Sequence, residues 1–81
     1  ALRSLEVLVQ PTMRRLTLRC KDCPRGAALH VLDATGRVVV QQSTRNLDGT
    51  EVHLPHLGTG AYMLRVSSAG GERTFRFAVT E

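Results

Sequence analysis

The sequence predicts an all-β fold, a small sandwich of two antiparallel sheets with about seven strands. Turn-forming residues recur roughly every 8 to 12 positions, which is typical of short consecutive strands. Between the turns, apolar and polar residues alternate with the two-residue period of a strand, and no helical period is present. A closed barrel is the alternative architecture that the same pattern allows.

Each strand is bounded by a proline, a glycine or a polar turn. Pro11 ends the first apolar run, Pro55 ends the fifth, and Gly70-Gly71 separates the last two. The predicted strands cover Leu5–Gln10, Arg15–Cys20, Ala27–Asp33, Arg37–Ser43, Thr50–Leu54, Ala61–Ser67 and Glu72–Val79.

The alternation also predicts which side chains face the core. We expect Val31, Tyr62, Leu64, Phe75 and Phe77 to be buried, since each falls on the apolar face of its strand. Two of the three aromatic residues lie in the last seven positions, so the terminal strand should contribute much of the core.

A chain of 81 residues forms one small domain with a thin core. No apolar run approaches the ~18 residues of a transmembrane helix, and no signal peptide is visible. We expect residues 1–81 to be a single domain excised from a larger protein.

The segment Leu57-Gly58-Thr59-Gly60-Ala61-Tyr62 is the most informative feature of the chain. Its two glycines predict a sharp, close-packed approach to the strand that a Cβ would hinder. A tyrosine placed after such a turn, with a hydroxyl able to hold nearby backbone, is typical of the tyrosine corner in immunoglobulin-like sandwiches.

A second motif, Asp33-Ala34-Thr35-Gly36-Arg37, separates two apolar strands. Aspartate suits the first position of a tight turn, and glycine suits a left-handed position. The motif therefore predicts a hairpin between the third and fourth strands.

Taken in order, these motifs and the terminal strand make the chain similar to the type A C-terminal sorting domain of the bacterial type IX secretion system. Members of that family have, in this order, Asp-x-x-Gly-Arg, a strand, Leu-x-x-Gly-x-Tyr, a strand, a glycine turn and a final strand. The chain departs from the family near Pro11, where Pro-Asn-Pro is usual. The resemblance assigns a sorting-motif role to Asp33, Gly36, Arg37, Leu57, Gly60, Tyr62, Arg76, Thr80 and Glu81.

The resemblance implies a non-catalytic signal that directs its cargo across the outer membrane. Its implied partners are the outer-membrane translocon and a shuttle β-barrel. A sortase-like protease and anionic lipopolysaccharide, through which cargo is attached to the cell surface, are also implied. The domain would pass through the periplasm and then be secreted or lie at the cell surface. No cofactor is implied.

The terminal strand has two interpretations. As an exposed edge strand, it could be read by a partner through β-augmentation, in which backbone hydrogen bonds give affinity. It could equally be a purely structural strand.

The net charge of +4 lies entirely at the N-terminal end: residues 1–28 hold six cations and two acids. Arg14, Arg15 and Arg19 are candidates to bind an anionic glycan, because arginine suits phosphate and carboxylate groups. A solvated strand face is the other interpretation. No aromatic residue lies among these charges to stack a base, so nucleic acid is not an expected partner.

The sequence also allows two functions other than a sorting signal. One is an immunoglobulin-like module that binds anionic lipopolysaccharide or another carbohydrate and is retained in a surface attachment complex. The other is a structural sandwich that caps a multidomain enzyme or adhesin.

Cys20-Lys21-Asp22-Cys23 is a Cys-x-x-Cys motif. A local disulfide is plausible in an exported domain, and free thiols are the main alternative. A zinc site would need two further ligands, for which His53 and His56 are the candidates. A redox motif would need a helix in a βαβ setting, which is absent.

Nothing in the sequence indicates catalysis. No Ser/His/Asp arrangement, paired acids or phosphate-binding loop is present. Asp33 and Asp48 both fall at turns, where aspartate commonly bonds its own backbone.

Overall fold

The computed structural model describes residues 4–10, 14–23, 25–54, 57–69 and 71–80. All seven predicted strands are present, and each predicted end lies within one residue of the observed one. The strands are β1 (Glu6–Gln10), β2 (Arg15–Arg19), β3 (Ala27–Leu32), β4 (Val38–Thr44), β5 (Glu51–His53), β6 (Gly60–Ser68) and β7 (Gly71–Val79).

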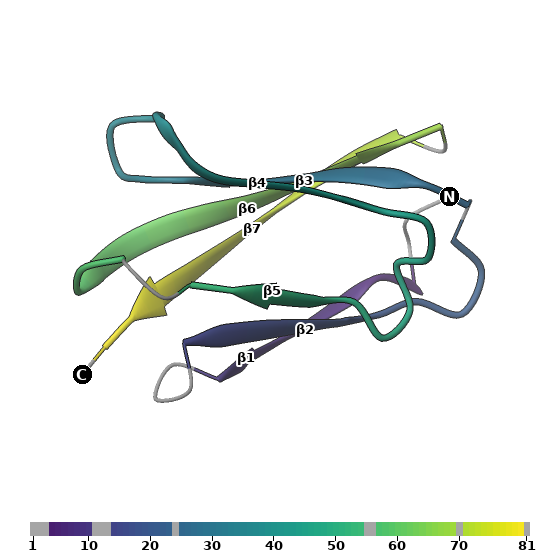
Figure 1. Cartoon of the computed structure of the whole chain (residues 1–81), viewed down its shortest axis with the longest axis horizontal. Coiled ribbons are helices and arrows are strands. Elements are labelled where there is room, and N and C mark those ends of the chain that lie inside the picture. The colour runs from purple at the N-terminus through teal and green to yellow at the C-terminus, as the bar shows by residue number, and fades with distance from the viewer. Residues whose placement is uncertain (1–3, 11–13, 24, 55–56, 70, 81) are drawn as a thin grey trace.

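The strands form two separate antiparallel sheets that face one another (Figure 1). The smaller sheet has the order β1-β2-β5, and the larger has the order β4-β3-β6-β7. The fold is therefore a sandwich and not the barrel that the sequence also allowed. β6 and β7 form its longest hairpin, paired from Gly60↔Val79 to Ser68↔Gly71.

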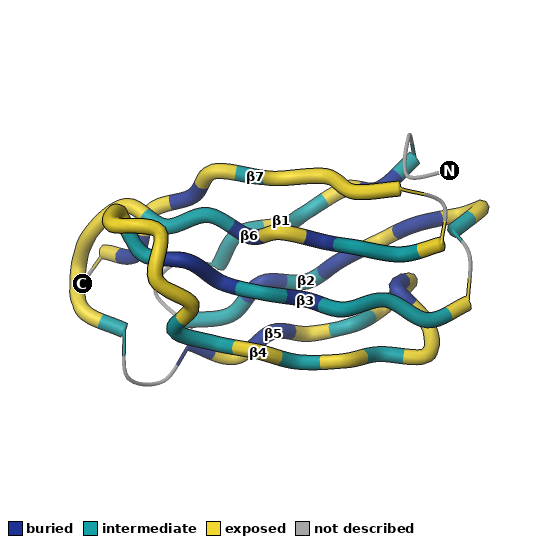
Figure 2. The backbone as a smooth tube through the Cα atoms, turned by 90° about the horizontal axis from the view of Figure 1, so that it is seen from above, coloured by how far each residue is buried: buried dark blue, intermediate teal, exposed yellow. Residues whose placement is uncertain are grey.

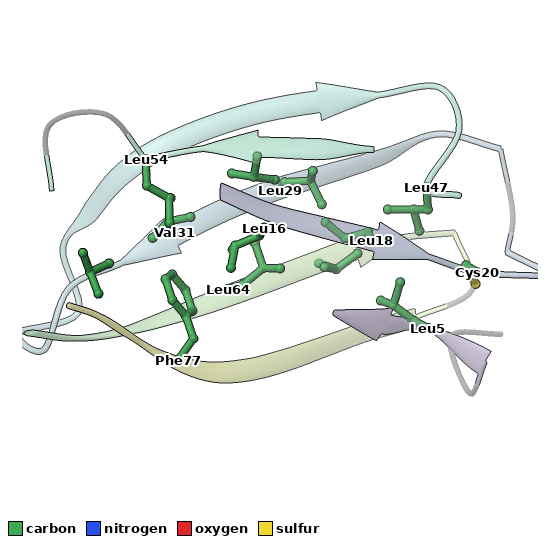
Figure 3. Packing of buried hydrophobic residues seen from close by; sticks show 13 residues of the cluster. Leu5, Leu16, Leu18, Cys20, Leu29, Val31, Leu47, Leu54, Leu64 and Phe77 are labelled. Carbon is green, nitrogen blue, oxygen red and sulfur yellow. The ribbon is translucent and has the colours of Figure 1, made fainter. Parts of the chain in front are cut away.

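A leucine- and valine-rich core fills the space between the sheets (Figure 3). Leu16 and Leu18 of β2 face Leu29, Leu64 and their neighbours, and all four are at most 1% exposed. Residues of both sheets point inward at alternate positions, as a sandwich core requires.

The core prediction is confirmed for Val31, Leu64 and Phe77, which are buried. Tyr62 and Phe75 are only half-buried and pack against the core from its margin. The terminal strand thus contributes to the core, but the aliphatic side chains of other strands fill most of it.

Two buried residues do not follow the strict alternation of inward and outward side chains along a strand. The register between β3 and β4 shifts between Val31 and Leu32, and these consecutive residues are 1% and 5% exposed. A β-bulge of this kind lets neighbouring side chains both be covered. Leu47, in the loop between β4 and β5, is fully buried and belongs to the core cluster.

The two long sides of the sandwich differ. β4 and β5 lie along one side (Figure 2), where Gln42 Nε2 donates to the Glu51 carbonyl at 3.1 Å and the Thr44 and Thr50 hydroxyls bond at 2.9 Å. β7 and β1 lie along the other side. There, an Arg73 guanidinium nitrogen lies 3.5 Å from the Leu5 carbonyl, near the beginning of β7.

Candidate functional site

The turn between β3 and β4 is organised by the Asp33 carboxylate. Its Oδ1 accepts hydrogen bonds from the Thr35 amide at 2.9 Å, the Thr35 hydroxyl at 2.6 Å and the Arg37 amide at 3.1 Å. Gly36 has a φ of 89°, a left-handed conformation that glycine adopts without a steric cost. Asp33, Gly36 and Arg37 therefore form one rigid turn.

The hydrogen bonds of this turn favour the charged form of Asp33. The hydrogen bond from the Thr35 side chain, followed by that from the Arg37 amide, lowers the pKa of the Asp33 carboxyl below its ordinary value. The Arg37 guanidinium lies 3.4 Å from Asp33 Oδ2, but its side chain is 79% exposed, so this ion pair adds little.

Tyr62 forms the corner that the sequence predicts. Its hydroxyl donates a hydrogen bond to the Gly58 carbonyl at 2.7 Å. Its ring stacks on Phe77, its cross-strand neighbour, with 5.9 Å between ring centroids. The expectation that a Cβ would be hindered at the two glycines is wrong: at Gly58 it would meet open space, and at Gly60 its nearest neighbour would be the Tyr62 ring at 4.0 Å, an ordinary contact. The role of Gly58 is instead to supply the carbonyl that accepts the Tyr62 hydrogen bond.

These two motifs converge with the terminal strand on one shallow depression of about 260 Å³ at an end of the sandwich. The β3–β4 turn, the beginning of β6 and the end of β7 all lie at this end (Figure 1). The residues that line the depression are Asp33, Ala34, Ala61, Tyr62, Met63, Arg76 and Phe77. We call this depression the motif-end site.

The motif-end site combines an apolar floor with two charges of opposite sign. Met63 and the two aromatic rings supply apolar surface, while Asp33 and Arg76 supply a carboxylate and an exposed guanidinium. Because Asp33 Oδ1 is already engaged within its turn, Arg76 is the better placed charge to contact a partner.

β7 borders the motif-end site and is an edge strand. It pairs with β6 along its whole length, and no strand of the described chain pairs with its other side. An edge strand offers unpaired backbone groups to another chain. Thr74 and Arg76 are exposed on β7, as the alternation predicts.

The other predicted motif residues lie around this end without lining the depression. Gly60 pairs with Val79 beside it. Leu57 packs against the core, and its carbonyl accepts a hydrogen bond from the Arg14 guanidinium. Thr80 is exposed after β7, and Glu81 lies outside the described residues.

The three arginines proposed for glycan binding do not form one patch. Arg14 donates to Leu57, as noted, and Arg15 bonds Gln10 Oε1 at 3.0 Å and Glu51 Oε2 at 3.4 Å. Arg19 is exposed, but it lies at the other end of β2, about 13 Å from Arg15 at the rise of a strand.

Cys20 and Cys23 are joined by a disulfide with a Cα–Cα distance of 5.7 Å, within the usual range. The candidate zinc ligand His53 pairs with Arg15 at the opposite end of β2, and His56 lies outside the described residues. Within the described ranges, no three His, Cys, Asp or Glu residues gather as metal ligands would.

Sequence reasoning missed Ala34, Ala61 and Met63 as part of the motif-end site, and it assigned Phe77 to the core alone. Each is a neighbour of a motif residue, but only the cross-strand register brings Met63 opposite Arg76. Such pairing carries no sequence signal of its own.

Comparison with known protein families decides the interpretation of these motifs. The sequence profile of the family described as "Secretion system C-terminal sorting domain" matches residues 10–80. The chain belongs to this family. The match supports a type IX secretion C-terminal sorting signal, and Asp33, Tyr62 and Arg76 lie within the matched residues.

A solved structure supports the fold. The chain is similar to a DUF3244 family protein with an immunoglobulin-like β-sandwich fold from Bacteroides vulgatus ATCC 8482, determined at 1.70 Å resolution. The TM-score is 0.78 at 17% sequence identity, and the alignment covers 95% of this chain and 84% of the other. The likeness shows the fold alone.

A search of curated proteins found no significant match. Among the described residues of this sorting domain, no helix has the length and apolarity needed to cross a membrane.

Proposed function

We propose that this sorting domain is a non-catalytic signal that the secretion machinery reads at the motif-end site. The observation that carries the proposal is the meeting of Asp33, Tyr62 and Arg76 in one depression. These residues come from three separate sequence motifs, and the fold brings them together beside a free sheet edge.

Recognition would use two components. The free edge of β7 supplies backbone groups that an extended partner segment can pair with, as in β-augmentation. The motif-end site supplies specificity, because Arg76 offers a charge and Met63 an apolar contact next to that edge. The Asp33 turn and the Tyr62 corner hold the depression in shape.

The partners that fit this role are the outer-membrane translocon and a shuttle barrel of the type IX system. The domain would cross the periplasm with its cargo and reach the cell surface or the medium. Attachment to anionic lipopolysaccharide by a sortase-like protease would follow as a separate step.

Direct binding of an anionic glycan through Arg14, Arg15 and Arg19 is the weaker alternative. Two of these guanidinium groups already contact protein acceptors, and the third lies at the far end of β2. Displacing Arg15 from Glu51 and Gln10 would offset part of any gain from a glycan contact.

Single substitutions in a passenger fusion test the proposal. Arg76→Ala removes the charged side chain of the motif-end site without touching the core, because Arg76 is exposed. We expect export to fall strongly while the melting temperature stays the same. The pair Thr80→Ala and Glu81→Ala extends the test to the end of the chain.

Arg65→Ala is the matched control. Arg65 is also an exposed arginine of the larger sheet, but it pairs with Glu72 and does not line the motif-end site. Equal export of both variants would contradict recognition at this site. A loss in Arg76→Ala that accompanies unfolding would show that the machinery reads only the intact sandwich.

A further inference from the structure

A second depression, of about 680 Å³, lies where the β2–β3 and β4–β5 loops meet, at the end of the sandwich opposite the motif-end site. Both loops are visible at the end that is far from the C-terminus (Figure 1). Its described lining consists of Cys23, Arg25, Gly26, Arg45 and Asn46. We call this depression the loop-end site.

The backbone holds the two loops of the loop-end site together. The Gly26 amide donates a hydrogen bond to the Arg45 carbonyl at 3.0 Å. The strand pairing continues directly from there, with Ala27 opposite Thr44. Arg25 and Arg45 are thus brought to one depression from positions twenty residues apart in the chain.

The disulfide stiffens the first of these loops. It joins Cys20 to Cys23, and Cys23 itself lines the depression. The Cys20 amide also donates to Asp48 Oδ1 at 3.0 Å, which ties the loop to the turn that follows Leu47. The disulfide and this hydrogen bond therefore both restrain the β2–β3 loop at the loop-end site.

The charges at this site are unbalanced. Arg25 and Arg45 are both exposed, and in the described part of the chain neither guanidinium has a hydrogen-bond or ion-pair partner. No acidic residue is among the described lining residues. Two like charges facing one depression repel each other, and a bound anion relieves that repulsion.

Asn46 adds a neutral donor. Its side-chain oxygen accepts a hydrogen bond from the Asp48 amide at 3.1 Å, which leaves the amide nitrogen to donate elsewhere. Asn46 lines the depression together with Arg25 and Arg45, so this nitrogen is available to donate to an acceptor-rich ligand there.

We infer that the loop-end site binds a phosphoryl group. Guanidinium groups present planar pairs of N–H donors that match phosphate oxygens, and two of them balance the double negative charge of a phosphate monoester. The depression is open, so the phosphate can be free or carried on a sugar. This inference is independent of how the export machinery recognises the domain.

Titration of the purified chain, followed by NMR of its backbone amides, tests the inference. Inorganic phosphate is added at constant ionic strength, with acetate as the control for a singly charged oxyanion. We expect phosphate to shift the Gly26 and Asn46 amide signals in a saturable manner, and acetate to do so much more weakly. Equal responses to the two anions would overturn the inference.

Variants assign the binding to the two arginines. Arg25→Ala and Arg45→Ala should each weaken phosphate binding by about tenfold, the cost of losing a charged hydrogen-bonding partner. Arg65→Ala removes the same charge from the outer face of the larger sheet and should leave binding unchanged. Unchanged binding in the first two variants, or an equal loss in the third, would overturn the inference.

Mannose 6-phosphate and mannose distinguish the two sources of the phosphoryl group. Tighter binding of the sugar phosphate than of free phosphate supports a phosphorylated glycan as ligand, and equal binding supports phosphate alone. Binding of unphosphorylated mannose with equal strength would contradict both.

Discussion

The Tyr62 hydroxyl donates a hydrogen bond to the Gly58 carbonyl at 2.7 Å, which fastens the segment before β6 to the strand itself. We expect Tyr62→Phe to lower the free energy of unfolding by about 1 kcal/mol, the net value of one such bond. Chemical denaturation measures this directly. A midpoint equal to that of the wild type would show that water replaces the bond at no cost.

Phe77 is the large aromatic residue of the core, 9% exposed and stacked on Tyr62. Phe77→Ala should cost ~3–5 kcal/mol, a range typical of buried phenylalanine truncation. Phe77→Leu keeps most of the apolar volume and loses the ring contact, so its cost should be nearer ~1 kcal/mol. Equal destabilisation by both variants would contradict this division between volume and stacking.

The lowered pKa of the Asp33 carboxyl predicts that the stability of the domain depends on pH. Its folded-state pKa is lowered, chiefly by the Thr35 side chain and the Arg37 amide, so the folded state favours the carboxylate. The resulting stabilisation is fully present above the ordinary aspartate pKa of ~3.9. It is lost as the pH falls through the lowered folded-state pKa.

Comparison with Asp33→Asn isolates this contribution. The wild type should be more stable than the variant at pH 7, and the difference should vanish at a pH below the folded-state pKa. Asp22→Asn removes a carboxylate from a different exposed turn and is the matched control. A difference between wild type and Asp33→Asn that stayed constant with pH would assign the effect to geometry and not to charge.

The Cys20–Cys23 disulfide closes a very short loop. The chain-entropy relation gives roughly 2 kcal/mol for a loop of this size, so the Cys20→Ser/Cys23→Ser variant should remain folded with a reduced melting temperature. A thiol assay on the exported wild-type domain should find no free cysteine. Two reactive thiols would contradict the bond.

The strands were predictable because nearly every one carries a clear period-two pattern and is bounded by proline or glycine. Two core residues lay beyond that reasoning. Leu47 is buried from a loop, and Leu32 is buried beside Val31 because a bulge shifts the register. Neither follows from alternation along one strand, since both depend on how separate segments pack.

The candidate site was likewise predictable in its single residues but not in how the fold brings them together. Asp33, Tyr62 and Arg76 could be singled out individually from their motifs, but their convergence depends on the β6–β7 register and on the β3–β4 turn. Conversely, Arg14 and Arg15 carry a suggestive charge in the sequence, and the fold directs both to protein acceptors. Charge along a chain does not reveal which cations are already engaged.

Export of a passenger tests the central claim most directly. A fluorescent protein with a periplasmic targeting signal is fused ahead of Ala1 and expressed in a strain with a working type IX system. The same passenger without the domain is the control. We predict that the fusion crosses the outer membrane and that the control remains in the periplasm. A fusion that stays in the periplasm with its domain folded would contradict a sorting function for this chain.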